Sequence, residues 1–170
     1  SLKSQVEELQ NKIKDLQGGD PTQVSGVQEV HDALIVSYDD YQKNKKADAA
    51  DKLVKINADR LTSDVAKSCY DKIKKATYAT ATKKYFEEGR DAYNGTGSYS
   101  KKDYDKSIKL LEKSLSFDEN NTDAIYFLGR CYQQKSDVEK AKSYYNKIVD
   151  NYPDSKRVSE AKRRLRELGE

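Results

Sequence analysis

Apolar side chains recur at steps of three and four residues along almost the whole chain after residue 26, and this spacing is the period of an α-helix. No segment of useful length alternates strictly between apolar and polar residues, as a half-buried strand does. One stripe runs from Val65 to Ala92 without a Pro and without a Gly before Gly89, and it predicts a single helix of about 28 residues capped by Thr62 or Ser63. The sequence therefore predicts an all-α fold.

The composition limits what kind of helical fold this is. Charged residues make up 36% of the chain and hydrophobic residues only 35%, which is little apolar material for one compact core. An array of helix pairs tolerates this composition, because each helix buries one stripe and exposes the rest. The net charge of +3 is too small to indicate a polyanionic partner by itself.

No feature of the sequence indicates a membrane span or a disulfide framework. No apolar run approaches the ~20 residues that cross a bilayer, and two cysteines, Cys69 and Cys131, are too few for a disulfide scaffold. The chain contains no Met, even at residue 1. We therefore expect a piece of a longer protein, with any signal or membrane anchor upstream of Ser1.

The segment 122–155 has the spacing of two antiparallel helices that cross closely. The residues that define the spacing are Leu128, Gly129, Tyr132, Ala141, Tyr145 and Pro153. Gly129 and Ala141 fall where the helices would approach most closely, because a larger side chain would separate them. The tyrosines would fill the space beside this crossing, and the proline would end the second helix. Ser136 and Glu139 predict a capping box at the start of that second helix.

A second copy of this spacing is predicted in 82–121. Its small residues at the crossing are Gly89 and Ser107, which are 18 residues apart (107 − 89), whereas the separation in 122–155 is 12 (141 − 129). Six extra residues are therefore expected in the loop 94–100.

A third, degenerate copy is predicted in 31–64, followed by the long helix from residue 64. Its matching positions are Leu34, Tyr41, Ala50 and Val54, and it has no Gly at the crossing. After Pro153 a last apolar stripe predicts a capping helix over 156–168.

The first 17 residues have a different pattern, the heptad repeat of a coiled coil. Val and Ile occupy one core position and Leu the other, a mixture typical of parallel two-stranded coils. The residues of this seam are Leu2, Val6, Leu9, Ile13 and Leu16. We expect the segment 1–17 to make the protein a homo-oligomer; the alternative is an amphipathic helix that packs on its own domain. Glycines, Pro21 and small polar residues then predict a linker over 18–26, before a helical repeat domain over 27–170.

The spacing in 122–155 resembles the tetratricopeptide repeat, a family of helix pairs that stack into an α-solenoid. The phrase Tyr152-Pro153-Asp154-Ser155, after a coil, a linker and earlier repeats, is similar to bacterial envelope proteins of the CpoB (YbgF) and BamD type. This resemblance implies a non-catalytic scaffold that binds a protein or peptide. It also implies a place in the bacterial cell envelope, outside the cytoplasm.

Ligands of tetratricopeptide repeat proteins usually lie along the concave surface formed by the first helix of each pair. Carried onto this sequence, that surface is formed by Phe86, Arg90, Asn94, Asp123, Tyr126, Arg130 and Gln133. Both copies place an aromatic residue four positions before an arginine, on one helix face. A guanidinium binds a carboxylate through two hydrogen bonds, so we expect an acidic peptide. The alternative is that Phe86 and Tyr126 only pack between repeats.

The sequence contains no convincing catalytic or cofactor-binding arrangement. His31 is the only histidine, and we expect it to be solvated or at the edge of the core. Cys69 and Cys131 lie on apolar helix faces, where buried, inert thiols are expected. The segment 95–97 has glycines but lacks the strand and the lysine of a phosphate loop. We therefore expect no enzyme activity, no metal and no cofactor.

The last helix indicates an alternative function. Its basic residues are Lys156, Arg157, Lys162, Arg163, Arg164 and Arg166, against Glu160 and Glu167. A nucleic-acid-binding module would use such a cluster to bind phosphates. We favour a solubilising face on a terminal helix, since no aromatic side chain interleaves the cluster for stacking on bases.

Overall fold

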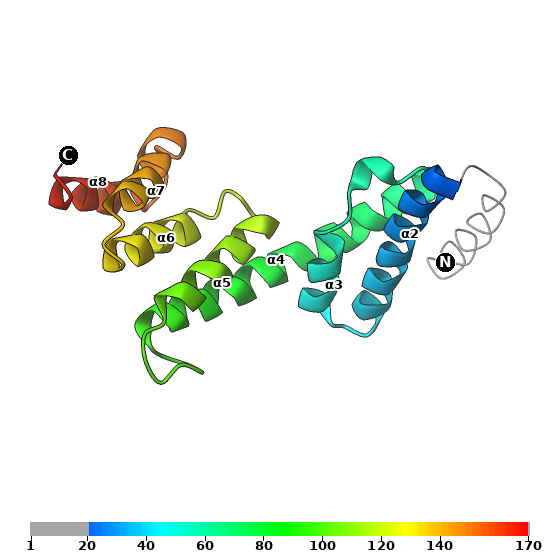
Figure 1. Ribbon diagram of the computed structural model, residues 1–170, viewed down its shortest axis with the longest axis horizontal. Coiled ribbons are helices and arrows are strands. Elements are labelled where there is room, and N and C mark those ends of the chain that lie inside the picture. The colour runs from blue at the N-terminus through cyan, green and yellow to red at the C-terminus, as the bar shows by residue number, and fades with distance from the viewer. Residues whose placement is uncertain (1–20, 170) are drawn as a thin grey trace. The chain divides into compact units, whose positions relative to one another are not determined.

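The computed structural model describes residues 21–169, which form seven α-helices, one short 3₁₀-helix and no strand (Figure 1). This confirms the predicted all-α fold. The predicted coiled coil over 1–17 lies outside the described residues. The chain divides into two compact units, one up to Ala81 and the other from Thr82 onward.

The first unit contains α2 (Pro21–Gln42), α3 (Lys46–Leu53), the 3₁₀-helix η1 (Ala58–Arg60) and the first part of α4 (Asp64–Asn94). The start of α2 corrects the predicted linker over 18–26, because residues 21–26 are helical. Pro is favoured in the first turn of a helix, where its missing N–H would have no partner in the helix.

Helices α2 and α3 cross at Ser37 and Ala49, which are both fully buried. The Ser37 hydroxyl donates a hydrogen bond of 2.8 Å to the Ala49 carbonyl. The two residues are 12 apart (49 − 37), the same separation as the small residues in 122–155. The crossing therefore lies one residue before Ala50 and Val54, the positions expected from the degenerate copy.

Helix α4 is continuous over 31 residues, so the predicted single long helix is confirmed. Of the two expected caps, Ser63 is the one used: its hydroxyl accepts a hydrogen bond of 3.1 Å from the Ala66 N–H.

The second unit contains the rest of α4, then α5 (Tyr104–Phe117), α6 (Thr122–Gln134), α7 (Val138–Asn151) and α8 (Val158–Glu167). Helix α5 packs on α6, α6 on α7, and α7 on α8 (Figure 1). The largest fully buried side chains of this unit are Leu111, Ile125, Leu128, Cys131, Tyr145 and Ile148.

Short polar side chains define where these helices begin. The N-caps of α5, α6 and α7 are Asp103, Asn121 and Asp137, and each accepts a hydrogen bond from the N–H three residues later. The predicted capping box of Ser136 and Glu139 is therefore wrong, because Asp137 is the cap. Ser136 has a positive φ of 61° instead, and it ends α6 in the left-handed conformation that closes many helices.

The close approaches predicted at Gly89 and Gly129 are present. A Cβ atom added at Gly129 would lie 2.6 Å from Cε1 of Tyr145, and one at Gly89 would lie 2.9 Å from Cγ of Leu111. At the first crossing the Ser107 hydroxyl also donates a hydrogen bond of 2.8 Å to the Gly89 carbonyl. These positions hold glycine because their neighbours occupy the space of a side chain.

We expect Gly129→Ala to lower the free energy of unfolding by about 1–3 kcal/mol, because the buried Tyr145 ring cannot move aside without strain. Gly26→Ala is the matched control, since a Cβ atom there meets only the end of the Arg60 side chain, at 3.3 Å. In a helix this second change should be stabilising, by up to about 1 kcal/mol. Chemical denaturation measures both effects. Equal stabilities of the Gly129→Ala and parent proteins would contradict the crossing.

Candidate functional site: an aromatic and arginine face of the second unit

The predicted ligand surface lies on the first helix of each pair in the second unit, that is, on α4 and α6. Phe86 is half-buried, and its ring meets the Phe127 ring edge-on, with centroids 5.9 Å apart. The Arg90 guanidinium lies 5.9 Å from the centroid of the Phe86 ring. The structure thus brings the first predicted aromatic–arginine pair together.

The second predicted pair, Tyr126 and Arg130, is arranged differently. The Arg130 guanidinium lies over the rings of Tyr93, at 4.7 Å, and Phe127, at 5.9 Å. Tyr126 is only 3% exposed and packs against Phe127 and Tyr145. Tyr126 therefore has the packing role that was the alternative, whereas Arg130 stacks on a ring contributed by α4.

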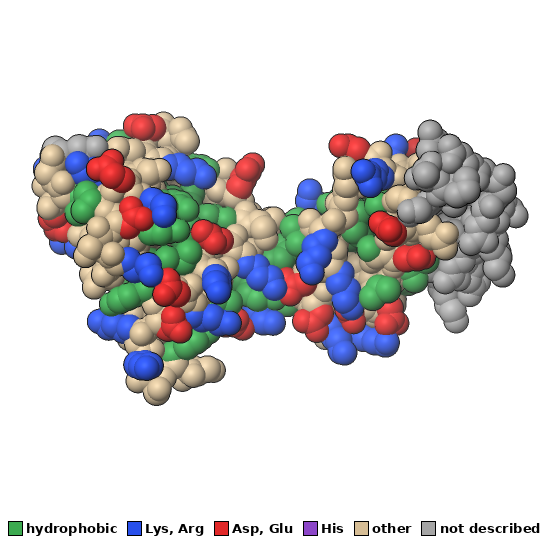
Figure 2. All heavy atoms as spheres, viewed as in Figure 1, with side chains coloured by type: hydrophobic (Ala, Val, Ile, Leu, Met, Phe, Trp, Pro, Cys, Tyr) green, Lys and Arg blue, Asp and Glu red, His purple; other side chains and the backbone are tan. Residues whose placement is uncertain are grey.

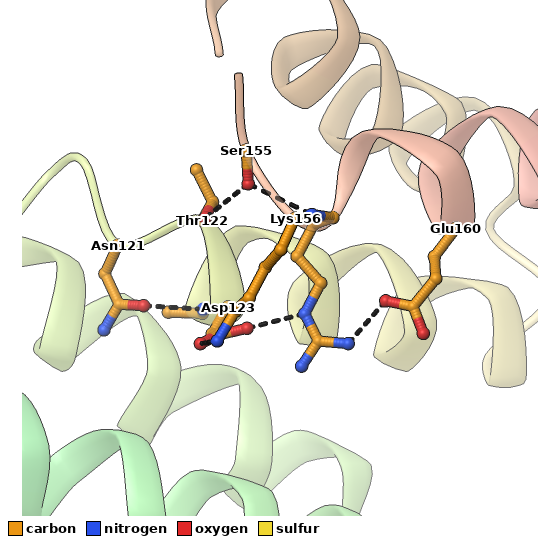
Figure 3. A network of polar contacts seen from close by, with 8 residues as sticks. Asn121, Thr122, Asp123, Ser155, Lys156 and Glu160 are labelled. Atoms are coloured by element: carbon orange, nitrogen blue, oxygen red, sulfur yellow. Dashed lines mark hydrogen bonds and ion pairs between the residues drawn. The ribbon is translucent and has the colours of Figure 1, made fainter. Parts of the chain in front are cut away.

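Asp123 belongs to a network that joins the start of α6 to the start of α8 (Figure 3). Lys156 and Arg157 both form ion pairs with its carboxylate, and Arg157 also pairs with Glu160. Burial raises the pKa of Asp123, but the hydrogen bonds from Lys156 and Arg157 outweigh burial, so the pKa is lowered. Asp123 is thus committed to a structural contact.

Two other predicted residues lie at the edge of this surface. Gln133 accepts a hydrogen bond of 3.0 Å from the Tyr145 hydroxyl, so it too serves the packing of α6 on α7. Asn94 is exposed at the last position of α4. The aromatic–arginine face, as we define it, therefore consists of Phe86, Arg90, Tyr93, Phe127 and Arg130.

Three residues near this face were not predicted from the sequence: Tyr93, Phe127 and, on the next first helix, Arg164. Arg164 follows Arg130 by 34 residues (164 − 130), one repeat length, and Arg130 follows Arg90 by 40 (130 − 90), one repeat with the six extra loop residues. The repeat period could have identified Arg164, because it had already placed the other two arginines.

The arginines differ in how their charges are balanced. Arg90 lies 3.7 Å from the Asp91 carboxylate, whereas no carboxylate of the described residues forms an ion pair with half-buried Arg130. In the basic cluster of α8, four of six side chains are paired with acids: Lys156, Arg157, Arg163 and Arg164. Figure 2 likewise shows basic and acidic side chains intermingled on the face in view.

The nucleophilic and metal-binding side chains of the described part are structural. Burial raises the pKa of Cys131 to about 11, and its thiol donates to the Ser107 hydroxyl at 3.1 Å. Cys69 is buried as well. His31 is 3% exposed, with Nδ1 2.8 Å from the Val27 carbonyl, so it lies in the core rather than in solvent. Over residues 21–169, no group of His, Cys, Asp and Glu could hold a metal ion, and no helix is long and apolar enough to cross a bilayer.

We expect Asp123→Asn to lower the free energy of unfolding at neutral pH by about 1–2 kcal/mol, because the amide loses two charge-assisted hydrogen bonds. The pKa of Asp123 is depressed, so its contribution is complete above an ordinary carboxyl pKa of about 4 and is lost as the pH falls through the lowered value. The two proteins should therefore converge in acid. Urea denaturation over a pH series measures this, with exposed Asp150→Asn as the control. A difference that persisted in acid would contradict the ion pairs.

Comparison with known proteins identifies part of the chain. Residues 98–165 match the family model described as "Tetratricopeptide repeat". No curated protein and no solved structure matches the chain. The matched residues include all of 122–155, where Gly129 meets Tyr145, and the end of the copy predicted over 82–121. The segment 98–165 of this all-helical chain therefore carries a tetratricopeptide repeat.

Proposed function

We propose that the protein is an interaction scaffold that binds an extended, acidic segment of a partner protein on its aromatic–arginine face. The tetratricopeptide repeat supports binding of a protein or peptide in general. The acidic character of the partner is inferred from the arginines of the face.

The observation that carries this proposal is the environment of Arg130. Its guanidinium is half-buried on the Tyr93 ring, and no carboxylate of the described residues balances its charge. A partly desolvated charge without a partner is costly, and the ring faces recover only about 0.5–2 kcal/mol. A carboxylate of a bound peptide would supply the missing charge, while Phe86 and Phe127 offer apolar contact.

We expect Arg90→Ala combined with Arg130→Ala to weaken peptide binding by about 2–4 kcal/mol, since both charged hydrogen-bond donors are lost. The melting temperature should change little, because arginines at a partly exposed surface add little stability. A random-peptide phage library selected on the parent protein provides the ligands, and calorimetry with the enriched peptides measures the affinities.

The control for this experiment is Lys162→Ala combined with Arg166→Ala, which removes the same charge from exposed positions of α8. Its affinity should equal that of the parent. If the Arg90/Arg130 variant binds the selected peptides as tightly as the control, the aromatic–arginine face is not the binding surface. If binding instead falls steeply with salt for random DNA or RNA and depends on Lys162 and Arg166, the nucleic-acid alternative is favoured.

We also propose that the seam over 1–17 makes the protein a parallel homodimer, and that the protein acts in the bacterial cell envelope. Support for the dimer is the heptad order of the seam, from Leu2 to Leu16. Support for the location is the likeness of the phrase over 152–155 to envelope proteins.

Sedimentation equilibrium tests the dimer. Barely two heptads bury little apolar area, so the parent should be monomeric when dilute and dimeric when concentrated. Replacing Leu9 and Ile13 by Asp should abolish this association without changing the stability of the second unit. A parent protein that stayed monomeric at high concentration would rule out the seam as an oligomerisation site.

A further inference from the structure

We infer that the acidic group of the partner is a carboxylate held between Arg130 of α6 and Arg164 of α8. This inference rests on the proposed function and gives it a specific subsite, in which Arg164 replaces Arg90 as the second arginine. Arg164 occupies the position of Arg130 one repeat later (164 − 130 = 34).

Arg164 has donor capacity that its own unit does not use. Its side chain is 22% exposed, and Nη1 donates a hydrogen bond of 2.8 Å to Glu167. Its Nε atom is buried and has no hydrogen-bond partner among the described residues. Buried donors are almost always satisfied, so a native exception requires an explanation. An acceptor from a ligand is one such explanation.

Arg130 and Arg164 act on the same tyrosines. Burial raises the pKa values of Tyr93 and Tyr145, and the positive charges of both arginines oppose that rise. Tyr126 forms a side-chain hydrogen bond with Arg164 and lies between these rings, with its centroid 5.9 Å from that of Tyr145. The two guanidiniums therefore border one patch of aromatic side chains, which holds them in place.

Arg90 is less suited to this role. Its side chain is 43% exposed, and the Asp91 carboxylate at 3.7 Å already offsets its charge. An exposed, internally paired arginine contributes little to binding an anion, because solvent and its own partner screen its charge.

The charge of the subsite selects a monoanion. Glu167 neutralises one charge at Arg164, whereas Arg130 has no acidic partner among the described residues. The pair and Glu167 together therefore carry one net positive charge. A carboxylate matches that charge and the planar fork of a guanidinium, whereas a phosphate dianion would leave an excess negative charge.

Three fluorescein-labelled octapeptides serve as probes and distinguish the two sources of a carboxylate. The first alternates Glu and Ala and has an amidated C-terminus. The second alternates Gln and Ala and has a free C-terminal carboxylate. The third alternates Gln and Ala and is amidated, so that it carries no carboxylate. We expect the first or the second to bind the parent protein in fluorescence anisotropy, and the third not to bind.

Arg164→Ala should weaken binding of that probe by about 10- to 100-fold, the value of a charged hydrogen-bond pair. Arg164→Lys keeps the charge and most of the stem but loses the fork, so it should also weaken binding. If the alanine variant fails to fold, the lysine variant tests the subsite in its place. Arg166→Ala, on the exposed side of α8, is the matched control and should bind as the parent does. Glu167→Gln removes the internal competitor for Arg164 and should tighten binding.

The results separate this inference from the proposed function. If both Arg164 variants bind the carboxylate probe like Arg166→Ala, or if no probe binds the parent, the subsite is wrong. The phage-derived peptides then decide independently whether the aromatic–arginine face binds a partner at all. An Arg Nε–Hε resonance of Arg164 that stays unmoved in NMR when the binding probe is added would also overturn the subsite.

Discussion

The arrangement of the second unit depends on how closely α6 approaches α7 at Gly129. The Tyr145 ring occupies the space of a side chain there, with Cε1 2.6 Å from where a Cβ atom would be. Its hydroxyl is fixed as well, through the hydrogen bond to Gln133. A ring held at both ends determines the position of its neighbour Tyr126, and through Tyr126 the position of Phe127. The face that carries Arg130 is therefore positioned from behind by a buried contact.

The attachment of α8 uses charge as well as apolar contact. Ala161 and Leu165 are its buried apolar residues, which is a small area for a helix of ten residues. The pairs of Asp123 with Lys156 and Arg157 add charge-assisted hydrogen bonds at the other end of the contact. The Ser155 hydroxyl also donates to the Thr122 hydroxyl at 2.8 Å (Figure 3). A polar attachment of this kind leaves the exposed side of α8 free to be charged.

The sequence predicted the features that follow from size and period. Gly129 and Ala141 could be placed because only small residues fit a close crossing, and the long α4 helix because no Gly or Pro interrupted its stripe. Contacts between helices were beyond this reasoning. Asp123 looked like a ligand-binding residue because its partner, Arg157, lies 34 residues away (157 − 123). Arg130 was assigned to Tyr126 on its own helix, although the ring of Tyr93 from α4 lies beneath it. Local errors had local causes: Ser136 and Asp137 are both good N-caps, and the choice depends on which residue adopts the left-handed conformation that ends α6.

The three arginines at equivalent positions show how one repeat position can serve different ends. Arg90 is balanced by Asp91 and Arg164 by Glu167, whereas Arg130 rests on aromatic rings without an acid among the described residues. A ring face attracts a cation by its quadrupole, but it accepts no hydrogen bond of the strength that a carboxylate does. Stacking therefore orients the guanidinium while leaving its donors available. Such a residue loses little conformational freedom when an anion binds, because the rings have already ordered it.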